Sequence, residues 1–415
     1  MALYNARGDE MTRISLGDGI SLACVTTERF KTNVLSVFLT RPLNPLDAPK
    51  NALIPSVLRR GNSNYPTLTD MSKRLADLYG AGLYPDVRKR GERHSFGLIS
   101  DFINNENLRD VSNLLFETLL NPIFSDAYVL SERDNLISQI RAVKNNKSVY
   151  ASARHTALAF EGEPYAVPRL GDEEQVAAIT PNLLRRYYDD ALSASAVSFF
   201  YCGSAEPESV GELISNHLSR VRGIALEKSD AVPICENSRH FFENNDMEQA
   251  QLSIFWRTGI LPENPDYFPA CVASAIYGGS SNSKLFTHVR ERLSLCYTTH
   301  SVFDRYKGVM RASAGVEPSM LDRARDEMLA QWNNVVCGDF TNEEISSAKK
   351  LIISELKSLE DSPSALEQFW HGQTVYRMSS APNDWIKAVE NVTLADIIRV
   401  TKDFKLDSTY YLRAD

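Results

Sequence analysis

The order of predicted secondary-structure elements in the first half of the chain recurs in the second half. In the first half, hydrophobic periodicity and turn residues predict a strand, two helices, a strand pair and a helix, at 33–40, 52–60, 69–79, 83–90 with 94–101, and 107–120. In the second half the same order is predicted at 250–257, 268–277, 283–293, 294–303 with 308–315, and 318–336. The two series lie roughly 210 residues apart, which indicates an ancient duplication.

The repeat predicts an α+β fold with two homologous α/β sandwich domains, each an antiparallel-rich sheet flanked by helices. The chain has 415 residues, which is too long for one ordinary hydrophobic core. We place the domains at 1–222 and 240–415. The stretch 223–239 mixes Lys, Ser, Asp, Pro and Asn, a composition typical of a linker.

Composition excludes two classes of partner. The formal net charge is −8 and no long run of Lys or Arg occurs, which argues against nucleic acid. No stretch approaches the ~18 apolar residues of a membrane span, and no leader pattern opens the chain, so a cytoplasmic protein without membrane contact is expected. An acidic protein suits a basic peptide better.

Cysteine and histidine are scattered. The cysteines form no Cys-x-x-Cys and are predicted to be small buried side chains; they are Cys24, Cys202, Cys235, Cys271, Cys296 and Cys337. No two histidines lie within one helical turn, and each is predicted to be a surface or hydrogen-bonded structural residue; they are His94, His155, His217, His240, His288, His300 and His371. A metal site assembled only by the fold stays open.

One basic cluster falls on the first predicted strand pair. Arg88, Lys89 and Arg90, with Arg93, are interpreted as a solvated turn, with a partner-docking edge as the alternative. The preceding strand at 83–87 is a candidate edge that receives an extended peptide by β-addition.

Three segments carry a resemblance to the pitrilysin/insulinase family of zinc peptidases. The first is Asn-Pro-Ile-Phe at 121–124, which leads to Glu132 and Arg133, and the second is Glu-Pro-Tyr at 163–165, where Glu163 stands at a usual His position. The third is Gly-Gly-Ser-Ser-Asn-Ser-Lys-Leu-Phe at 278–286, followed by Val-Arg-Glu at 289–291 and Leu-Cys-Tyr at 295–297. The resemblance covers nearly the whole chain and implies two related halves that close like a clamshell.

The family's zinc ligands are missing from this chain. Members bind zinc through His-x-x-Glu-His on the first helix and a Glu on a later helix. Val-Leu-Arg-Arg-Gly at 57–61 sets the register, in which Ala52 and Ser56 replace the histidines and Pro55 replaces the general base. Glu132 keeps the first acidic position, but the ligand position is Gln139, and a neutral amide is a poor zinc ligand. We therefore expect no metal and no other cofactor here.

The resemblance also implies a retained pair, Arg290 and Tyr297. In the family the Arg holds a substrate carbonyl, and the Tyr hydroxyl donates to the scissile carbonyl as it gains charge. Some members are two-chain enzymes in which one subunit carries zinc, and this chain resembles the non-catalytic subunit of the bacterial two-chain members. The implied partners are a peptide and a zinc-bearing homologue in a heterodimer, with self-association as the alternative.

Three functional hypotheses follow from these observations. The first is a non-catalytic peptidase homologue that binds peptide and complements a zinc-bearing partner. The second is a purely structural subunit with the same fold. The third is an active metallopeptidase with an unorthodox metal site. The sequence contains no Gly-x-Ser-x-Gly elbow and no Walker phosphate loop that would point to another catalytic class.

Overall fold

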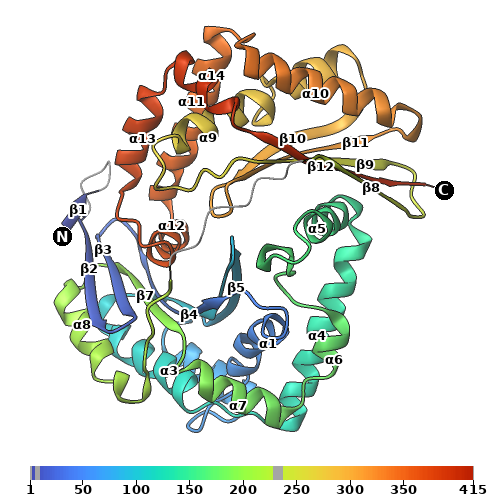
Figure 1. The fold of residues 1–415 in the computed structure, drawn as a ribbon. Helices are drawn as coiled ribbons and strands as arrows, with labels where there is room; N and C mark the ends of the chain where they lie inside the picture. Colours follow the sequence, from blue (N-terminus) through green and yellow to red (C-terminus); the bar gives the residue numbers. More distant parts are fainter. Residues whose placement is uncertain (1, 5–9, 228–236, 415) are drawn as a thin grey trace. The chain divides into compact units, whose positions relative to one another are not determined.

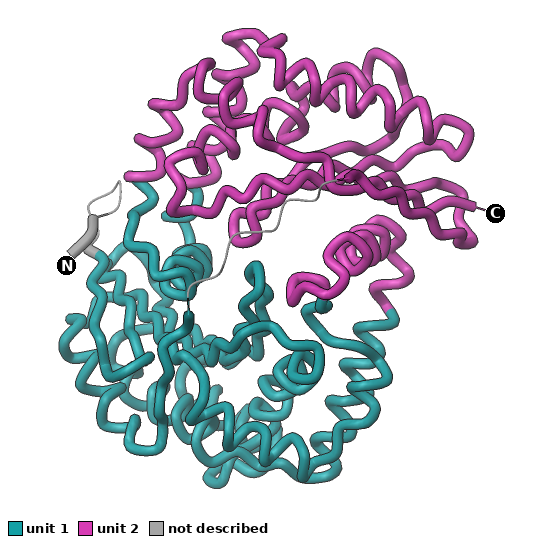
Figure 2. Tube along the Cα trace, viewed as in Figure 1, with its two compact units in different colours: residues 1–141, 167–228, 358–383 teal, residues 142–166, 229–357, 384–415 magenta. Residues whose placement is uncertain are grey.

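The computed structural model describes residues 2–4, 10–227 and 237–414. Cys235 and residues 228–236 of the predicted linker lie outside the described residues. The chain forms two compact units (Figure 2). Unit 1 comprises residues 1–141, 167–228 and 358–383, and unit 2 comprises residues 142–166, 229–357 and 384–415.

Unit 1 is built on a seven-stranded sheet of order β1-β2-β3-β7-β4-β6-β5. Its strands are β1 (Ala2–Tyr4), β2 (Glu10–Gly17), β3 (Ile20–Thr26), β4 (Thr32–Pro42), β5 (Tyr84–Arg90), β6 (Arg93–Ile103) and β7 (Ala196–Gly203). Only the β3/β7 pair among these described strands is parallel. The β2–β3 hairpin turns at Asp18 and Gly19, and Gly19 has a φ of 65°, a conformation that favours glycine.

Helices cover both faces of this sheet (Figure 1). They are α1 (Ala48–Leu58), α2 (Leu68–Asp77), α3 (Leu108–Leu120), α4 (Asp126–Asn145), α6 (Glu173–Ala177), α7 (Pro181–Ala191), α8 (Pro207–Ser215) and α12 (Pro363–Val375), with the 3₁₀ turns Asn105–Asn107, Leu218–Arg220 and Leu359–Asp361. α12 lies on one face, and α1, α3, α7 and α8 lie on the other. No helix among the described residues is long and apolar enough to cross a membrane.

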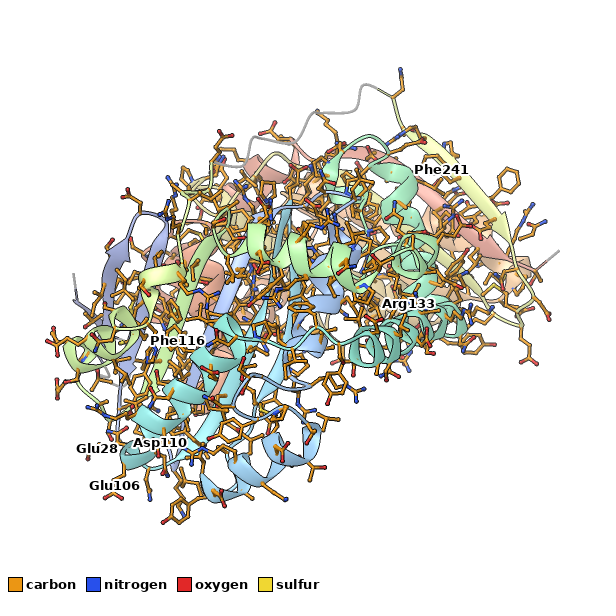
Figure 3. All side chains as sticks on the ribbon, turned by 90° about the horizontal axis from the view of Figure 1, so that it is seen from below. Glu28, Glu106, Asp110, Phe116, Arg133 and Phe241 are labelled. Carbon is orange, nitrogen blue, oxygen red and sulfur yellow. The ribbon has the colours of Figure 1, made fainter. Side chains whose placement is uncertain are left out.

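Local sequence explains where these helices begin and which face they bury. Thr67 caps α2 in a capping box, in which its side chain accepts from the Asp70 N–H at 3.1 Å. α3 is amphipathic: Asp110 is exposed at the rim of unit 1, whereas Phe116 is 1% exposed in the core (Figure 3).

Unit 2 is built on a five-stranded sheet of order β10-β11-β9-β12-β8. Its strands are β8 (Arg239–Asn244), β9 (Ala250–Arg257), β10 (Cys296–Asp304), β11 (Val309–Val316) and β12 (Lys405–Arg413). Its helices are α5 (Lys147–Ala159), α9 (Tyr267–Gly278), the π-helix η4 (Leu285–Arg292), α10 (Leu321–Cys337), α11 (Asn342–Ser358), α13 (Pro382–Asn391) and α14 (Leu394–Thr401), with the 3₁₀ turns Pro164–Ala166 and Pro318–Met320. α5 covers one face of this sheet, and α9, α10, α11 and α14 cover the other.

The two sheets share one topology, so the predicted duplication and the predicted fold class are confirmed. The order β3-β7-β4-β6-β5 in unit 1 corresponds strand by strand to β8-β12-β9-β11-β10 in unit 2. The single parallel pair occupies the same place in both, β3/β7 and β8/β12. The predicted strand pairs at 83–101 and 294–315 are the antiparallel pairs β5/β6 and β10/β11.

Each unit contains one segment from the opposite half of the chain. α5 belongs to unit 2, where it packs on β9 and β12, and α12 belongs to unit 1, where it packs on β4 and β7. The sequence-based domains at 1–222 and 240–415 contain no such exchange, and their boundaries stay a prediction.

The described cysteines are all free thiols. Cys24, Cys202 and Cys296 are buried, as the sequence predicts for small side chains in apolar segments. Cys337 differs because it is the last residue of α10 and is exposed.

Candidate functional site

α1 carries Ala52, Pro55 and Ser56, the positions that the resemblance assigns to the zinc site, and their side chains do not fit the metal. Ala52 is 5% exposed, Pro55 is buried within the helix, and Ser56 is half-buried. A methyl group, a pyrrolidine ring and a hydroxyl provide neither imidazole nor carboxylate, the donors that tetrahedral zinc sites use. Pro55 also lacks an N–H to donate to the preceding turn of α1.

The two later positions lie on α4. The Glu132 carboxylate accepts hydrogen bonds from the Arg60 guanidinium and from Asn135 Nδ2, the latter at 3.3 Å. Arg60 also donates to Ser131 Oγ at 3.2 Å. Gln139 is exposed on the same helix. The retained carboxylate therefore holds the turn that follows α1 against α4, a structural role.

No other metal centre is present among the residues that the structure describes. No group of three His, Cys, Asp or Glu side chains lies close enough together there to hold an ion. Three of the histidines are buried and hydrogen-bonded; they are His94, His155 and His371. The absence of bound metal itself stays a prediction for chemical analysis.

A buried polar cluster beside the degenerate positions was not predicted from the sequence. Asn51 Nδ2 donates to His94 Nδ1 at 3.1 Å, and the Tyr187 hydroxyl donates to Asn51 Oδ1 at 2.8 Å. Burial lowers the pKa of His94 to about 4, against a smaller opposing effect of the Arg169 backbone. The available signal was Asn51 itself, a polar residue inside an apolar helix.

Arg290 lies on η4 in unit 2. π-Helices are rare in proteins, and those that occur are often found at functional sites. The Arg290 guanidinium carbon lies 4.5 Å from the centroid of the Phe286 ring, and Nε lies 3.7 Å from Glu291 Oε1. The side chain is 40% exposed. Arg290 is therefore oriented by stacking on an aromatic ring while its charge stays accessible.

Tyr297 lies at a β-bulge at the start of β10. Cys296 pairs with Val316 and Thr298 pairs with Gly315, so Tyr297 is the extra residue. Its side chain is 64% exposed, although tyrosine usually buries much of its ring. Ser294, between η4 and β10, has a φ of 50°. Bulges re-aim side chains and are frequent next to active sites, so both retained residues lie on irregular backbone within one short segment.

The interpretation of the basic cluster as a solvated turn is wrong, because its side chains are bonded within unit 1. Arg88 is 9% exposed and pairs with Glu367 on α12. Lys89 Nζ donates to the Val167 carbonyl at 2.9 Å. Arg90 contacts His371 Nδ1 at 2.7 Å, and Arg93 donates to the Glu227 carbonyl. α12, which is more than 260 residues away in sequence, supplies partners that the local pattern does not reveal.

β5 is the outermost strand of its sheet, as predicted for the stretch 83–87. Tyr84 is 50% exposed at its start. Two β5 carbonyls accept side-chain hydrogen bonds: that of Val87 from Arg169 Nη1 at 3.0 Å, and that of Arg90 from the Tyr376 hydroxyl at 2.8 Å. Binding of a peptide at this edge stays a prediction.

Comparison with known proteins agrees with this architecture. Residues 178–352 match the peptidase M16 inactive domain. The probable inactive metalloprotease YmfF of Bacillus subtilis is 28% identical over 95% of this chain and 96% of its own length. The mitochondrial-processing peptidase subunit beta of Dictyostelium discoideum is 18% identical over 84% of this chain and 76% of its own.

Solved structures show the same fold. A conserved protein from Enterococcus faecalis has a TM-score of 0.90 at 25% identity and covers 98% of this chain and 99% of its own. The peptidase M16 inactive domain structure from Pseudomonas fluorescens has a TM-score of 0.82 at 15% identity and covers 98% of both chains. Residues 178–352 therefore match a peptidase M16 inactive domain, the chain is similar over nearly its whole length to a probable inactive metalloprotease, and its sequence contains no His-x-x-Glu-His.

Proposed function

We propose that this chain is a non-catalytic M16 subunit that binds peptide and presents Arg290 and Tyr297 to the zinc centre of a partner homologue. The observation that carries the proposal is a contrast between the two units. α1 in unit 1 contains no His, Cys, Asp or Glu that could bind zinc or act as a general base. The η4–β10 segment in unit 2 keeps an arginine and an exposed tyrosine on irregular backbone.

Tyr297 supplies the chemistry in this proposal. A hydroxyl fixed near the scissile carbonyl stabilises the charge that develops on its oxygen, and such donors are strongest when they are preorganised. The bulge leaves Tyr297 as the extra residue of the ladder and directs a large, partly apolar side chain into solvent. A purely structural segment gains nothing from that arrangement, because burial of the ring is favourable.

Arg290 supplies the substrate contact. Its planar guanidinium can donate two hydrogen bonds to one carbonyl or carboxylate group. Stacking on Phe286 at 4.5 Å limits the rotamers of a long side chain, so less entropy is lost when peptide binds. The outer edge of β5 offers a second contact, with the backbone of an extended peptide. The net charge of −8 favours a basic peptide.

The partner in this proposal is a zinc-bearing M16 homologue from the same cell. One relative is by name a subunit of a processing peptidase, which supports a two-chain assembly. The donor set on α1 does not fit zinc, so the metal must come from the other chain. A self-associated pair would consist of two copies that both lack metal ligands on α1. Neither copy could then supply the zinc that the proposed role requires.

The proposal is tested by co-purifying the chain with its zinc-bearing homologue and assaying peptide cleavage by each chain and by the mixture. Cleavage by the mixture alone supports complementation. A stable complex in which the homologue cleaves equally well without this chain would favour the purely structural alternative. Cleavage by this chain alone would favour an unorthodox metal site.

A further inference from the structure

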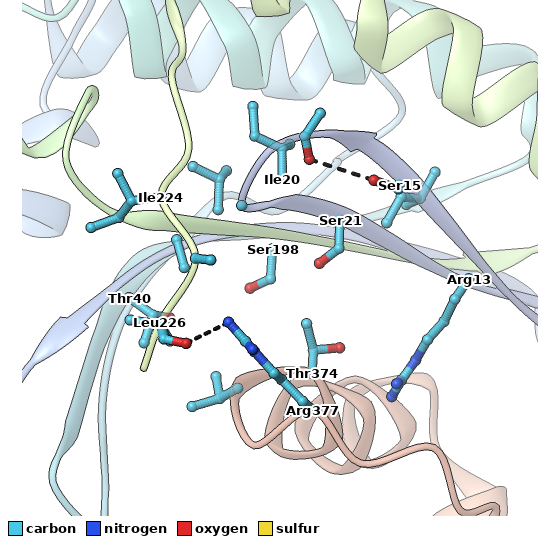
Figure 4. Close-up of a pocket in the computed structure, with 17 residues that line it drawn as sticks. Arg13, Ser15, Ile20, Ser21, Thr40, Ser198, Ile224, Leu226, Thr374 and Arg377 are labelled. Atoms are coloured by element: carbon cyan, nitrogen blue, oxygen red, sulfur yellow. Dashed lines mark hydrogen bonds between the residues drawn. The ribbon is translucent and has the colours of Figure 1, made fainter. Parts of the chain in front are cut away.

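Unit 1 contains a cavity of about 360 Å³ between its sheet and the C-terminal end of α12 (Figure 4). Residues of β2, β3, β4 and β7 form one wall, residues 374–377 form the opposite wall, and residues 224–226 close one side. A volume of this size is at the lower end of the range for small-molecule sites. The proposed peptidase-like role uses none of these residues.

Arg13 on β2 reaches across the cavity toward α12 (Figure 4). Its Nη1 donates to the Met378 carbonyl, and its guanidinium carbon lies 5.6 Å from the centroid of the Trp370 ring. The Nε and Nη2 groups are buried and have no hydrogen-bond partner among the described residues. These two N–H groups lie along one edge of the guanidinium, the fork that binds carboxylate or phosphate with two parallel bonds.

The arginine is charged but has no acidic neighbour among the described residues that line the cavity. Two of the described lining residues, Arg13 and Arg377, are cationic, and none of them is Asp or Glu. Burial lowers the pKa of Arg13 to about 10, which is still well above neutral pH. A buried charge without a counter-charge is costly, and so is each unpaired N–H. An anionic ligand would remove both costs.

The cavity lining offers further polar groups. Ser198 on β7 is 8% exposed, and its Oγ is buried without a hydrogen-bond partner among the described residues. Ser21 and Thr374 also line the cavity. Arg377 has a φ of 54°, a strained conformation for a non-glycine residue, and its Nη2 donates to the Leu226 carbonyl. Strain that places a cation at the wall is typical of a functional position.

We propose that this cavity binds a small molecule that carries a carboxylate or phosphate group. The Nε/Nη2 edge of Arg13 receives two oxygens of that group, and the hydroxyl of Ser198 bonds a further polar atom of the ligand. The remaining volume, lined in part by apolar side chains of β3 and of residues 224–226, holds the body of the molecule.

The test titrates the full-length chain with sodium phosphate and, separately, with sodium acetate, at constant ionic strength set by chloride. Calorimetry and thermal unfolding measure binding. We expect saturable binding of at least one probe together with a rise in the melting temperature. Phosphate alone would identify a phosphoryl ligand, and acetate alone a carboxylate ligand. Binding of neither probe overturns the proposal.

Variants locate the site. Arg13→Met should weaken binding by about 10- to 100-fold, because it removes a charged, two-bond contact. Arg109→Met, at an exposed arginine on α3 of the same unit, removes the same charge and should leave binding unchanged. Ser198→Leu places a larger side chain in the cavity from β7 and should abolish binding, and this variant tests the proposal if the Arg13 variant does not fold. Equal binding by wild type and a folded Arg13→Met or Ser198→Leu variant would contradict the proposal.

Discussion

Arg88 on β5 donates two hydrogen bonds to the Glu367 carboxylate on α12, from Nη1 at 3.0 Å and from Nη2 at 2.7 Å. Ser36 Oγ donates a third at 3.0 Å. Glu367 is 1% exposed, so this bidentate ion pair is buried. It attaches a helix from the second half of the chain to the sheet of unit 1.

Unit 2 holds its exchanged segment in the same way. Glu163, which follows α5, accepts from Arg257 Nη1 at 2.6 Å and from Lys307 Nζ at 2.7 Å. Arg257 Nε in turn donates to Asp407 at 2.7 Å. The position at which the family usually has a histidine is therefore occupied here by a carboxylate with a packing role. Both exchanged segments are fixed by a glutamate that meets an arginine of the receiving sheet.

Breaking the pair in unit 1 should be costly. Glu367→Gln removes the buried charge and leaves Arg88 only the partly exposed Asp86 carboxylate, which it contacts through Nε at 2.7 Å, so the free energy of unfolding should fall by up to about 3–5 kcal/mol in urea titrations. Asp190→Asn breaks a pair with Arg41 in which the aspartate is 58% exposed, and should cost ~1 kcal/mol or less. Similar losses for the two variants would show that burial does not strengthen the Arg88 pair.

Acidification should destabilise the protein through His94. The side chain is neutral in the fold because burial lowers its pKa to about 4 from 6.5. Between pH 6.5 and pH 4 this side chain is protonated in the unfolded chain but not in the folded chain. The contribution of neutral His94 to the free energy of unfolding is therefore fully present above pH 6.5 and is lost as the pH falls toward 4. His94 should contribute a slope of about 1.4 kcal/mol per pH unit. His94→Gln should reduce the measured slope by that amount, and an unchanged slope would show that His94 titrates normally.

The fold was largely predictable because its signals are local. Alternating strands and the repeated order of elements depend on residues close together in sequence. The exchange of α5 and α12 was not predictable, because each helix has the same local pattern whichever sheet it covers. For the same reason the local sequence predicts a solvated cluster at Arg88, because its partner Glu367 lies 279 residues away.

The missing zinc ligands of the candidate site could be predicted from the sequence, whereas the backbone around Arg290 and Tyr297 could not. Ala52, Pro55 and Ser56 could be placed on one helix from the register of residues 57–61 alone. The bulge at Tyr297 and the π-helix under Arg290 could not, because both depend on how η4 joins β10. The cavity at Arg13 had no sequence signal, since its lining comes from five separate stretches of chain.

The purified chain should contain no stoichiometric zinc. The positions at Ala52, Pro55 and Ser56 offer no imidazole or carboxylate, and Gln139 offers only an amide. Elemental analysis after dialysis against zinc and then metal-free buffer measures this directly. One zinc per chain that disappears in Ser56→Ala or Gln139→Ala would refute the account of α1.

Arg290→Ala should weaken peptide binding by the mixed enzyme. In the proposed function the guanidinium contacts the substrate in both the ground state and the transition state, so its loss should raise KM and leave kcat nearly unchanged. Arg292→Ala, at an exposed arginine on the same π-helix, is the matched control and should alter neither constant. A fall in kcat at constant KM would assign Arg290 to the transition state instead.

Tyr297→Phe, assayed in the mixture with the zinc-bearing homologue, tests the complementation account most directly. The substitution keeps the ring and removes only the hydroxyl that we place at the developing oxyanion. Turnover should fall by roughly 10²- to 10³-fold, with the complex intact by size-exclusion chromatography. Tyr79→Phe, at a tyrosine that is 72% exposed in unit 1, should leave turnover unchanged. Equal turnover by wild-type and Tyr297→Phe mixtures would show that the hydroxyl takes no part in cleavage.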